Sequence, residues 1–221
     1  MGDSQNFDPT DKQHRIIQTW LSRVAIIIGI DLTVRGTIQK SPVFVVANHI
    51  SWLDIVIIAS VLPVSFLSKV EVRKWPVVGT LAAKSGTLFI HRGSKSGALE
   101  AKRLMQERLS AGHSVASFPE AKATDGTVVH TFYPRLFAAA IETKSVIQPA
   151  ALRYPHHQGV NPIVPFVDNR NLVKHAFRIM SAKRTAAELT LCEPIPSEDQ
   201  LRKQLALLAR NSIAEVVENS S

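Results

Sequence analysis

Residues 43–54 read Val-Phe-Val-Val-Ala-Asn-His-Ile-Ser-Trp-Leu-Asp, and this stretch decides the fold. Val43–Ala47 is a short apolar run, which is typical of a buried strand. The polar residues Asn48 and His49 follow it, and the apolar segment 55–62 beyond them predicts a helix. A buried strand that passes through a polar turn into a helix is the unit from which α/β sheets are built.

The rest of the chain repeats this alternation of strands and helices. Short apolar runs predict further strands at residues 64–67, 87–90, 115–118, 146–152 and 189–192. Helical spacing predicts helices over residues 98–110, 136–142 and 198–218, and a capping box that starts at Ser197 opens the last one. We therefore expect an α/β fold of one domain, in which a central, mostly parallel sheet is flanked by helices.

The N-terminal part, residues 1–40, is expected to hold a disordered lead-in over residues 1–10 and then one amphipathic helix. Apolar residues with helical spacing share one face of this helix: Ile16, Ile17, Trp20, Leu21, Val24, Ala25 and Ile28. The polar residues lie on the other face: Arg15, Gln18, Thr19, Ser22 and Arg23. Two interpretations stay open. The helix packs on the core, or it lies in a membrane interface with Trp20 at headgroup depth and Arg23 at the lipid phosphates.

The composition narrows the class of protein. The 221 residues include 26 Lys and Arg against 18 Asp and Glu, which gives a net charge of +8 and predicts an anionic partner. The single cysteine, Cys192, excludes an internal disulfide framework and a Cys-based zinc site. No apolar run approaches the roughly 20 residues that a transmembrane helix needs. The polar, acidic start predicts no cleaved signal peptide.

A second basic segment, residues 170–184, holds five basic residues and no acidic one. Its apolar residues fall at helical spacing: Leu172, Val173, Ala176, Phe177 and Met180. Lys174 and Arg178 lie on the polar side of this predicted helix. Such a helix suits an anionic bilayer, and a solvated charged face explains the pattern equally well.

His49 and Asp54 are the candidate catalytic residues. His49 follows a strand, where α/β sheets place their ligand sites, and imidazole is suited to general-base work near neutral pH. Asp54 can meet it if His49 lies in the turn before the helix and Asp54 in its first turns. The alternative is structural: His49 caps the helix and Asp54 favours its N-terminus.

Four segments resemble, in the right order, the sequence blocks of the glycerolipid (lysophospholipid) acyltransferases. The first block is Asn-His-x-Ser-Trp-x-Asp at residues 48–54, and the second is Gly-Thr-Leu-Phe-Ile-His-Arg at residues 86–92. The third is Phe118-Pro119-Glu120 with Asp125-Gly126, and the fourth is Val-Ile-Gln-Pro-Ala at residues 146–150. By this resemblance residues 41–221 form an acyltransferase domain, preceded by the helix in residues 1–40.

The resemblance implies an O-acyltransferase. Such an enzyme moves a fatty acyl group from coenzyme A or acyl carrier protein to the free hydroxyl of a lysophospholipid. The expected acceptor is 1-acyl-sn-glycerol 3-phosphate, giving phosphatidic acid, and the alternative is another lysolipid such as lyso-ornithine lipid. His49 would remove the hydroxyl proton and Asp54 would orient His49, with no covalent acyl-enzyme, no cofactor and no metal. We expect a peripheral protein on the cytoplasmic face of the inner membrane.

The resemblance also assigns substrate-binding residues. Arg92 would hold the acceptor's phosphate, and Glu120 would bind its polar headgroup or brace the loop. Asn48 and Ser51 belong to the first block, and Pro149 would shape the fourth.

The third block departs from the family pattern. Ala121, Lys122 and Ala123 occupy the positions where many relatives have Gly, Thr and Arg. The arginine that would contact phosphate is therefore absent from its usual place. Either Lys122 replaces it as a point charge, or the acceptor is not lysophosphatidate.

Two functions of other classes find weaker support in the sequence. Gly112-His113-Ser114 is similar to part of a serine hydrolase elbow, but here the helix precedes the serine and the strand follows it. A basic nucleic-acid-binding protein fits the charge, but no zinc finger, RNA-binding signature or stacking pattern supports it. We therefore expect no nucleic-acid partner. The adjacent His156 and His157 lack metal-ligand spacing and predict a solvated loop.

Overall fold

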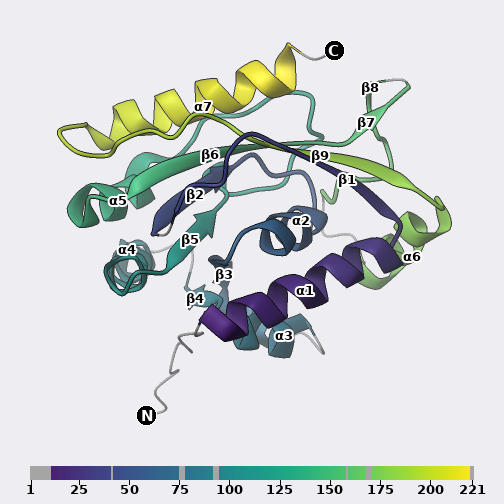
Figure 1. Ribbon diagram of the computed structural model, residues 1–221, viewed down its shortest axis with the longest axis horizontal. Helices are drawn as coiled ribbons and strands as arrows, with labels where there is room; N and C mark the ends of the chain where they lie inside the picture. Colours follow the sequence, from purple (N-terminus) through teal and green to yellow (C-terminus); the bar gives the residue numbers. More distant parts are fainter. Residues whose placement is uncertain are drawn as a thin grey trace.

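The computed structural model describes residues 11–40, 42–74, 78–91, 95–157, 159–167 and 171–219. Its main feature is a seven-stranded sheet with the order β1-β9-β6-β2-β5-β3-β4 (Figure 1). All neighbouring strands pair in parallel except β6 and β9, which pair antiparallel. The expected α/β fold with a mostly parallel sheet is confirmed.

The strands have the following bounds: β1 Ile30–Arg35, β2 Val43–Ala47, β3 Val64–Lys69, β4 Leu88–Ile90, β5 Ser114–Ser117, β6 Val146–Arg153, β7 Pro155–His156, β8 Gly159–Val160 and β9 Thr185–Leu191. The α-helices are α1 Asp11–Ile27, α2 Leu53–Val61, α3 Val78–Lys84, α4 Lys95–Ser110, α5 Phe137–Thr143, α6 Leu172–Ser181 and α7 Arg202–Glu218. Two short 3-10 helices, η1 Val70–Lys74 and η2 Pro134–Leu136, complete the described elements.

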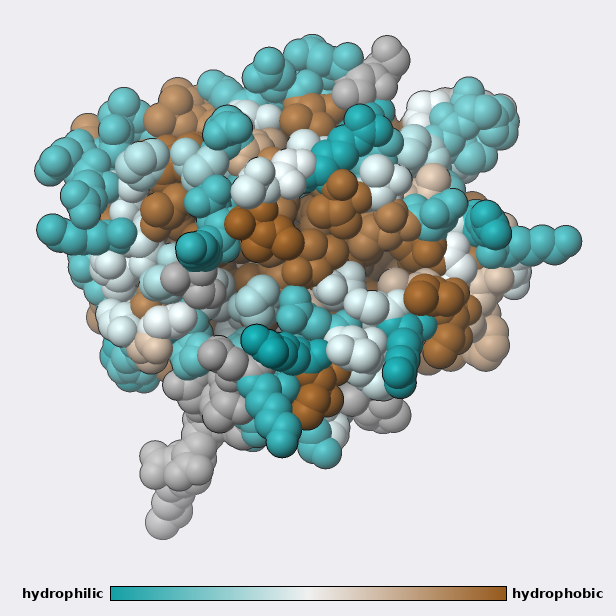
Figure 2. All heavy atoms as spheres, in the orientation of Figure 1, coloured by the Kyte–Doolittle hydropathy of each residue, from teal (hydrophilic) through white to brown (hydrophobic). Residues whose placement is uncertain are grey.

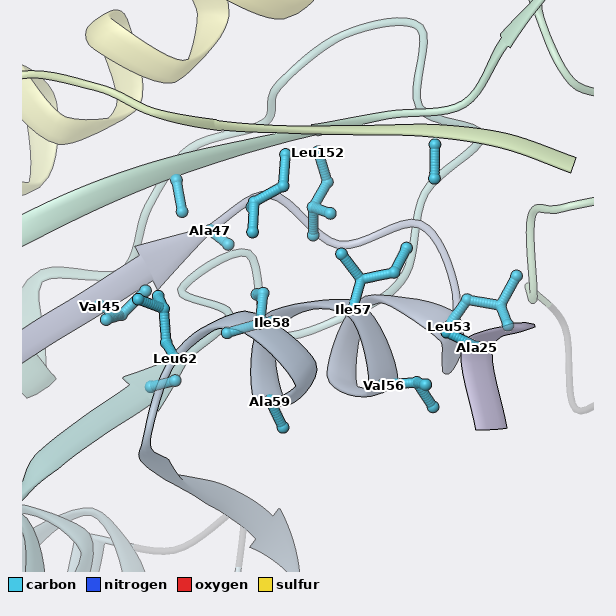
Figure 3. Packing of buried hydrophobic residues seen from close by; sticks show 14 of the residues in the cluster. Ala25, Val45, Ala47, Leu53, Val56, Ile57, Ile58, Ala59, Leu62 and Leu152 are labelled. Carbon is cyan, nitrogen blue, oxygen red and sulfur yellow. The ribbon is translucent and has the colours of Figure 1, made fainter. Parts of the chain in front are cut away.

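Helices cover both faces of the sheet. On one face, α2 packs its Ile57 and Ile58 against Val45, Ala47 and Leu152 of the central strands (Figure 3). Helix α1 lies over α2 on the same side (Figure 1). On the other face, α4, α5 and α7 bury a second cluster of apolar residues. The central strand β2 is buried on both sides, which is why its sequence is an uninterrupted apolar run.

Most of the expected elements exist close to their predicted bounds, and two starts are wrong by four residues. Strand β9 begins at Thr185, not at residue 189. The last helix begins at Arg202, not at residue 198. Ser197 does not cap it, because its buried hydroxyl donates to the carbonyl oxygen of Ala140 on α5. Asp199 has a positive φ of 56°, which is incompatible with a right-handed helix at that residue.

The N-terminal part is not a separate unit that ends at residue 40. Residues Ile30–Arg35 form β1, which pairs with β9 at the edge of the main sheet. No apolar run predicts this edge strand, because it carries Asp31 and Arg35 and its last three residues are exposed. The expected lead-in over residues 1–10 lies outside the described residues.

The two faces of helix α1 differ from expectation only in part. Leu21, Val24 and Ala25 pack towards the core as expected, whereas Gln18 and Ser22 also point inward. The side chain of Gln18 donates to the carbonyl oxygen of Val61, and Ser22 donates to that of Ser60. These polar residues face α2 because its C-terminal carbonyl groups need donors. Ile16, Trp20 and Ile27 are exposed on the opposite side of α1.

Candidate active site

The strands of the four blocks end at the same edge of the sheet. Strands β2 and β5 are parallel neighbours, and β6 lies on the other side of β2. Strand β4 belongs to the same parallel set through β3. Carboxyl ends of parallel strands are where α/β sheets collect their functional groups. The loop after β2 carries His49, and the turn after β5 carries Glu120.

His49 and Asp54 meet in the geometry that the sequence made possible. His49 lies in the turn before α2, and Asp54 lies in the first turn of that helix. The distance from His49 Nδ1 to Asp54 Oδ2 is 2.8 Å. The imidazole side chain is 21% exposed, whereas the carboxylate is fully buried. With Nδ1 engaged, Nε2 is the ring nitrogen available to a substrate.

Asp54 is buried as a fully partnered carboxylate. Its Oδ2 also accepts hydrogen bonds from the backbone N–H groups of Ile50 at 2.7 Å and Ser51 at 2.9 Å. Its Oδ1 accepts from the phenol of Tyr154 at 2.6 Å. A buried charge is tolerated only when such donors replace the water that it has lost. The loop of the first block therefore wraps around the carboxylate.

The third block holds the peptide groups of His49 from both sides. The backbone N–H of His49 donates to Glu120 Oε1 at 2.9 Å. Its carbonyl oxygen accepts from the backbone N–H of Thr124 at 2.8 Å and from the Thr124 hydroxyl at 3.1 Å. The second oxygen of Glu120 accepts from the backbone N–H of His130 at 3.0 Å. Burial raises the pKa of Glu120, and the hydrogen bonds from His130 and His49 partly oppose this rise.

An aromatic stack fixes the ring of His49. Phe118 lies parallel to it, with 4.1 Å between the ring centroids and 17° between the planes. Phe66 of β3 stacks in turn on Phe118, with 5.9 Å between the two ring centroids.

Three residues that we expected to bind substrate are buried in the scaffold instead. The amide of Asn48 donates to the carbonyl oxygen of Leu152, and its side-chain oxygen accepts from the Leu152 N–H. Ser51 is fully buried and contributes its backbone N–H to Asp54. Pro149 is buried within β6, where it pairs with Val46. Direct substrate contact by these side chains is therefore not supported, because their surfaces are covered by the protein.

The other three residues expected to bind substrate, Glu120, Lys122 and Arg92, have different outcomes. Glu120 is 3% exposed, and both of its oxygens hold backbone N–H groups, which is the geometry of a brace. Lys122 is exposed. Arg92 lies outside the described residues. Ala121 has a positive φ of 63°, which explains why a glycine suits this position in the family pattern.

Sequence reasoning missed Tyr154 and Thr124, and it quoted Phe118 without giving it a role. These residues lie 64 or more positions away from Asp54 in the chain, so no local spacing connects them to it. One signal was available for Tyr154. It lies two residues beyond the C-terminal end of a predicted central strand, next to that of the first block.

Trp52 connects the first block to α6. Its indole Nε1 donates to His175 Nδ1 at 3.0 Å, and His175 is 4% exposed on the inner face of α6. The ring of Phe166 lies 5.0 Å from that of His175, and the Phe166 N–H donates to the Ile50 carbonyl at 2.9 Å. Helix α6 therefore packs directly behind the candidate active site.

The outward faces of α1 and α6 are apolar and flanked by basic residues. On α6, Val173 and Phe177 are each 63% exposed, next to the exposed Lys174 and Arg178. On α1, Trp20 is 44% exposed and Arg23 is exposed. Hydrophobic side chains gather between β1 and α1 and again where the end of α1 lies near α6 (Figure 2). Among the helices in the described parts of the chain, none combines the length and apolar composition that crossing a bilayer requires.

The residues that could have indicated a serine hydrolase or a metal site have structural roles instead. Ser114 is 2% exposed, and its hydroxyl accepts from the Val43 N–H at 3.1 Å. It begins β5, so the strand follows the serine as the sequence indicated. Within the described residues, no group of three or more His, Cys, Asp or Glu side chains is placed to hold a metal ion. His156 lies in the short strand β7, and His157 is the exposed turn residue that follows.

Comparison with known proteins gives consistent findings. A family model described as Acyltransferase matches residues 30–153. A lyso-ornithine lipid O-acyltransferase from Pseudomonas aeruginosa is 37% identical over 206 residues, which are 93% of this chain and 80% of that protein. A 1-acyl-sn-glycerol-3-phosphate acyltransferase from Neisseria gonorrhoeae is 32% identical over 194 residues, which are 87% of this chain and 76% of that protein.

A solved structure has the same fold. The crystal structure of the 1-acyl-sn-glycerophosphate acyltransferase PlsC from Thermotoga maritima superposes with a TM-score of 0.66. The match covers 98% of this chain and 83% of that chain at 22% sequence identity.

Proposed function

This chain belongs to the acyltransferase family and acts as an O-acyltransferase on lysolipids, and we propose that His49 and Asp54 are its catalytic pair. The observation that carries the proposal is the 2.8 Å contact between His49 Nδ1 and a buried, fully partnered carboxylate. The reaction replaces a thioester bond of the donor with an ester bond to the lysolipid hydroxyl.

His49 is the general base of this mechanism. Nε2 takes the proton of the lysolipid hydroxyl as the oxygen forms a bond to the carbonyl carbon of the thioester. The carbon–sulfur bond then breaks, and the imidazolium gives its proton to the departing thiolate. The products are the acylated lipid and a free thiol, and the enzyme regains its starting state.

Asp54 keeps the imidazole ready for this proton transfer. Its bond to Nδ1 fixes the tautomer that leaves Nε2 unprotonated, and its negative charge supports the imidazolium that forms. Glu120, Thr124 and Phe118 hold the backbone and the ring of His49. General-base catalysis of this kind is typically worth about 10²–10⁴ in rate.

The acyl group passes directly from donor to acceptor in this proposal. Burial raises the pKa of Cys192, the single cysteine of the chain, to about 11, so its thiol is protonated at neutral pH. A covalent acyl-cysteine needs a thiolate, which this environment disfavours. The Ser114 hydroxyl is buried at the start of β5 and bonded to Val43.

For the acceptor we favour a lyso-ornithine lipid. Ala123 stands where many relatives have a phosphate-binding arginine, and the 37% identical relative is named for this acceptor. Ornithine carries one carboxylate and one ammonium group, whereas a phosphate monoester carries about −1.5 to −2 charges. The ornithine headgroup therefore needs fewer cations. We propose that Arg92 and Lys122 bind the anionic group of the acceptor.

1-Acyl-sn-glycerol 3-phosphate, which would give phosphatidic acid, is the second candidate acceptor. It is favoured by the 32% identical relative that is named for it. In that case Arg92 and Lys122 would have to balance the larger charge of the phosphate.

The proposed donor is acyl-coenzyme A or acyl carrier protein. Residues 61–110 hold nine Lys and Arg against three Glu, and this excess suits the phosphates of coenzyme A and the acidic carrier protein. Both donors are cytoplasmic thioesters. We therefore place the reaction at an anionic surface, the cytoplasmic face of the inner membrane, where α1 and α6 would dock.

The test is a turnover assay with one labelled acyl thioester and a panel of lysolipids. His49→Ala and Asp54→Asn are each expected to lower turnover by at least about 10²-fold while the thermal unfolding transition stays cooperative. Turnover of lyso-ornithine lipid alone supports the favoured acceptor, and turnover of lysophosphatidate alone supports the second. Full activity of either variant would falsify the assigned roles.

A further inference from the structure

We propose that Tyr154 is a third member of the catalytic unit, a positioning residue that acts on His49 through Asp54. The inference rests on the proposed function of the His49–Asp54 pair. It assigns a role to a residue outside the four sequence blocks.

The contacts divide the two oxygens of Asp54 between different parts of the chain. Oδ2 faces the first block and serves His49, Ile50 and Ser51. Oδ1 accepts from the Tyr154 phenol at 2.6 Å, a length typical of an O–H donor bonded to a charged oxygen. Tyr154 therefore determines how the carboxylate is rotated about its own bond to the helix. That rotation sets the direction of the oxygen that faces His49.

The phenol is suited to be a permanent donor. Tyr154 is 1% exposed, and burial together with the Asp54 charge raises its pKa well above the usual value. It therefore stays protonated at neutral pH and keeps its hydrogen bond to the carboxylate.

The backbone holds Tyr154 and the first block in register with one another. Tyr154 follows β6, which pairs with β2 so that Ala150 lies beside Ala47. The side chain of Asn48 bonds both the N–H and the carbonyl of Leu152, two residues before Tyr154. The carbonyl oxygen of Tyr154 accepts from the Asn161 N–H at 2.8 Å. Asn48 thus gains a function that does not need substrate contact, because it ties the tyrosine to the histidine loop.

Loss of the phenol oxygen would leave Asp54 Oδ1 buried without this donor. The carboxylate would then be free to rotate or to admit water, and the Nδ1 bond would lose its direction. Partners that orient a functional group in this way typically affect activity about 10- to 100-fold. The effect falls on the chemical step, since Tyr154 itself is too buried to touch either substrate.

The experiment compares Tyr154→Phe with Tyr133→Phe in steady-state acyl transfer. The chain has two tyrosines, and Tyr133 is 62% exposed, so it is a matched control for the loss of one hydroxyl. We expect Tyr154→Phe to lower kcat about 10- to 100-fold with KM for both substrates changed less than about 3-fold. Tyr133→Phe should leave both constants unchanged.

A second comparison separates positioning from a general loss of structure. In an Asp54→Asn background, Tyr154→Phe should lower the residual rate by less than about 2-fold, because its route to His49 is already broken. The same fold-loss in both backgrounds would overturn the inference, and so would a Tyr154→Phe enzyme with normal kcat. If His49→Ala remains fully active, the proposed function itself fails, which is a distinct result.

A variant that keeps the shape of the side chain covers the case in which Tyr154→Phe does not fold. Fluorinated tyrosine incorporated into the Tyr133→Phe protein would occupy residue 154 alone. As a stronger hydrogen-bond donor it should draw charge from Asp54 and lower kcat severalfold. An unchanged kcat in this protein would contradict the role of the phenol.

Discussion

The edge of the sheet that carries the proposed active site differs from the outer faces of α1 and α6 in which side chains are buried. At the edge, Asp54 and Glu120 are buried and every carboxylate oxygen has a donor. On the outer helices, Trp20 and Phe177 are exposed while the polar side chain of Gln18 bonds inward. Buried charges with internal partners are typical of a rigid unit. Exposed apolar faces with basic flanks need a partner from outside the chain.

The largest effect expected outside His49, Asp54 and Tyr154 tests whether the buried charge of Glu120 is needed. Glu120→Gln keeps the shape but places an amide donor against one of two backbone N–H groups. The loop that carries His49 should loosen, and kcat should fall by at least about 10-fold, since a hydrogen bond to a charged group contributes about 1.5–3 kcal/mol. Steady-state kinetics check this.

The matched control for Glu120 is Glu142→Gln, at an exposed carboxylate that pairs with Lys102 on the surface. It should leave kcat unchanged, because exposed ion pairs contribute little. Equal losses of kcat in Glu120→Gln and Glu142→Gln would mean that burial of the Glu120 charge is not what matters.

The next effect tests the outer face of α6. Lys174→Glu with Arg178→Glu should weaken binding to vesicles that contain anionic lipid by about 10-fold or more, because each cation near such a surface adds about 1 kcal/mol. The control Arg202→Glu with Lys203→Glu makes the same change of net charge on α7, which covers the other face of the sheet. Vesicle flotation at low and high salt measures both.

Trp20→Ala tests the apolar part of the docking face. It should weaken vesicle binding severalfold even at high salt, where charge attraction is screened. Leu207→Ala, at an exposed apolar residue of α7, is its control. Vesicle binding that is indifferent to both the charges and Trp20 would remove α1 and α6 from the proposed membrane surface.

A smaller effect appears at alkaline pH and concerns the buried edge alone. The pKa of Tyr154 is raised above its usual value near 10, so the unfolded chain loses the phenol proton first. The stability that this phenol confers is complete below pH 10 and falls as the pH rises above it. Urea unfolding across this range should show a shallower decline for Tyr154→Phe than for the wild type. Parallel declines would mean that folding does not raise the pKa of Tyr154.

The smallest expected effect concerns Ala121, whose positive φ of 63° is disfavoured for a residue with a Cβ atom. Ala121→Gly should raise the free energy of unfolding by about 0.5–1 kcal/mol, since relief of strain exceeds the entropy that glycine adds to the unfolded chain. Chemical denaturation measures the change. A destabilised Ala121→Gly protein would show that the turn of the third block is not strained.

Much of the active-site edge was predictable because its core is local. His49 and Asp54 are five residues apart, and one strand–turn–helix unit brings them together. The brace from Glu120 and the hydrogen bond from Tyr154 were not predictable in this way. They come from residues 71 and 100 positions away, and only the order of the strands places them beside the first block.

For the outer helices, the sequence predicts the elements but not which of their residues face outward. Periodicity correctly predicts that α1 and α6 are amphipathic helices, but it assigns Gln18 and Ser22 to a solvent face when they bond α2. It also places Leu172 and Phe177 together, although α6 half-buries the first and exposes the second.

The sequence by itself determined the α/β class, the His49–Asp54 spacing and the basic, amphipathic character of two helices, because these depend on neighbours a few residues apart. Only the tertiary structure decided which side of each helix faces outward and which distant groups surround the carboxylate. Those choices depend on what each surface packs against, and packing joins parts of the chain that no local pattern relates.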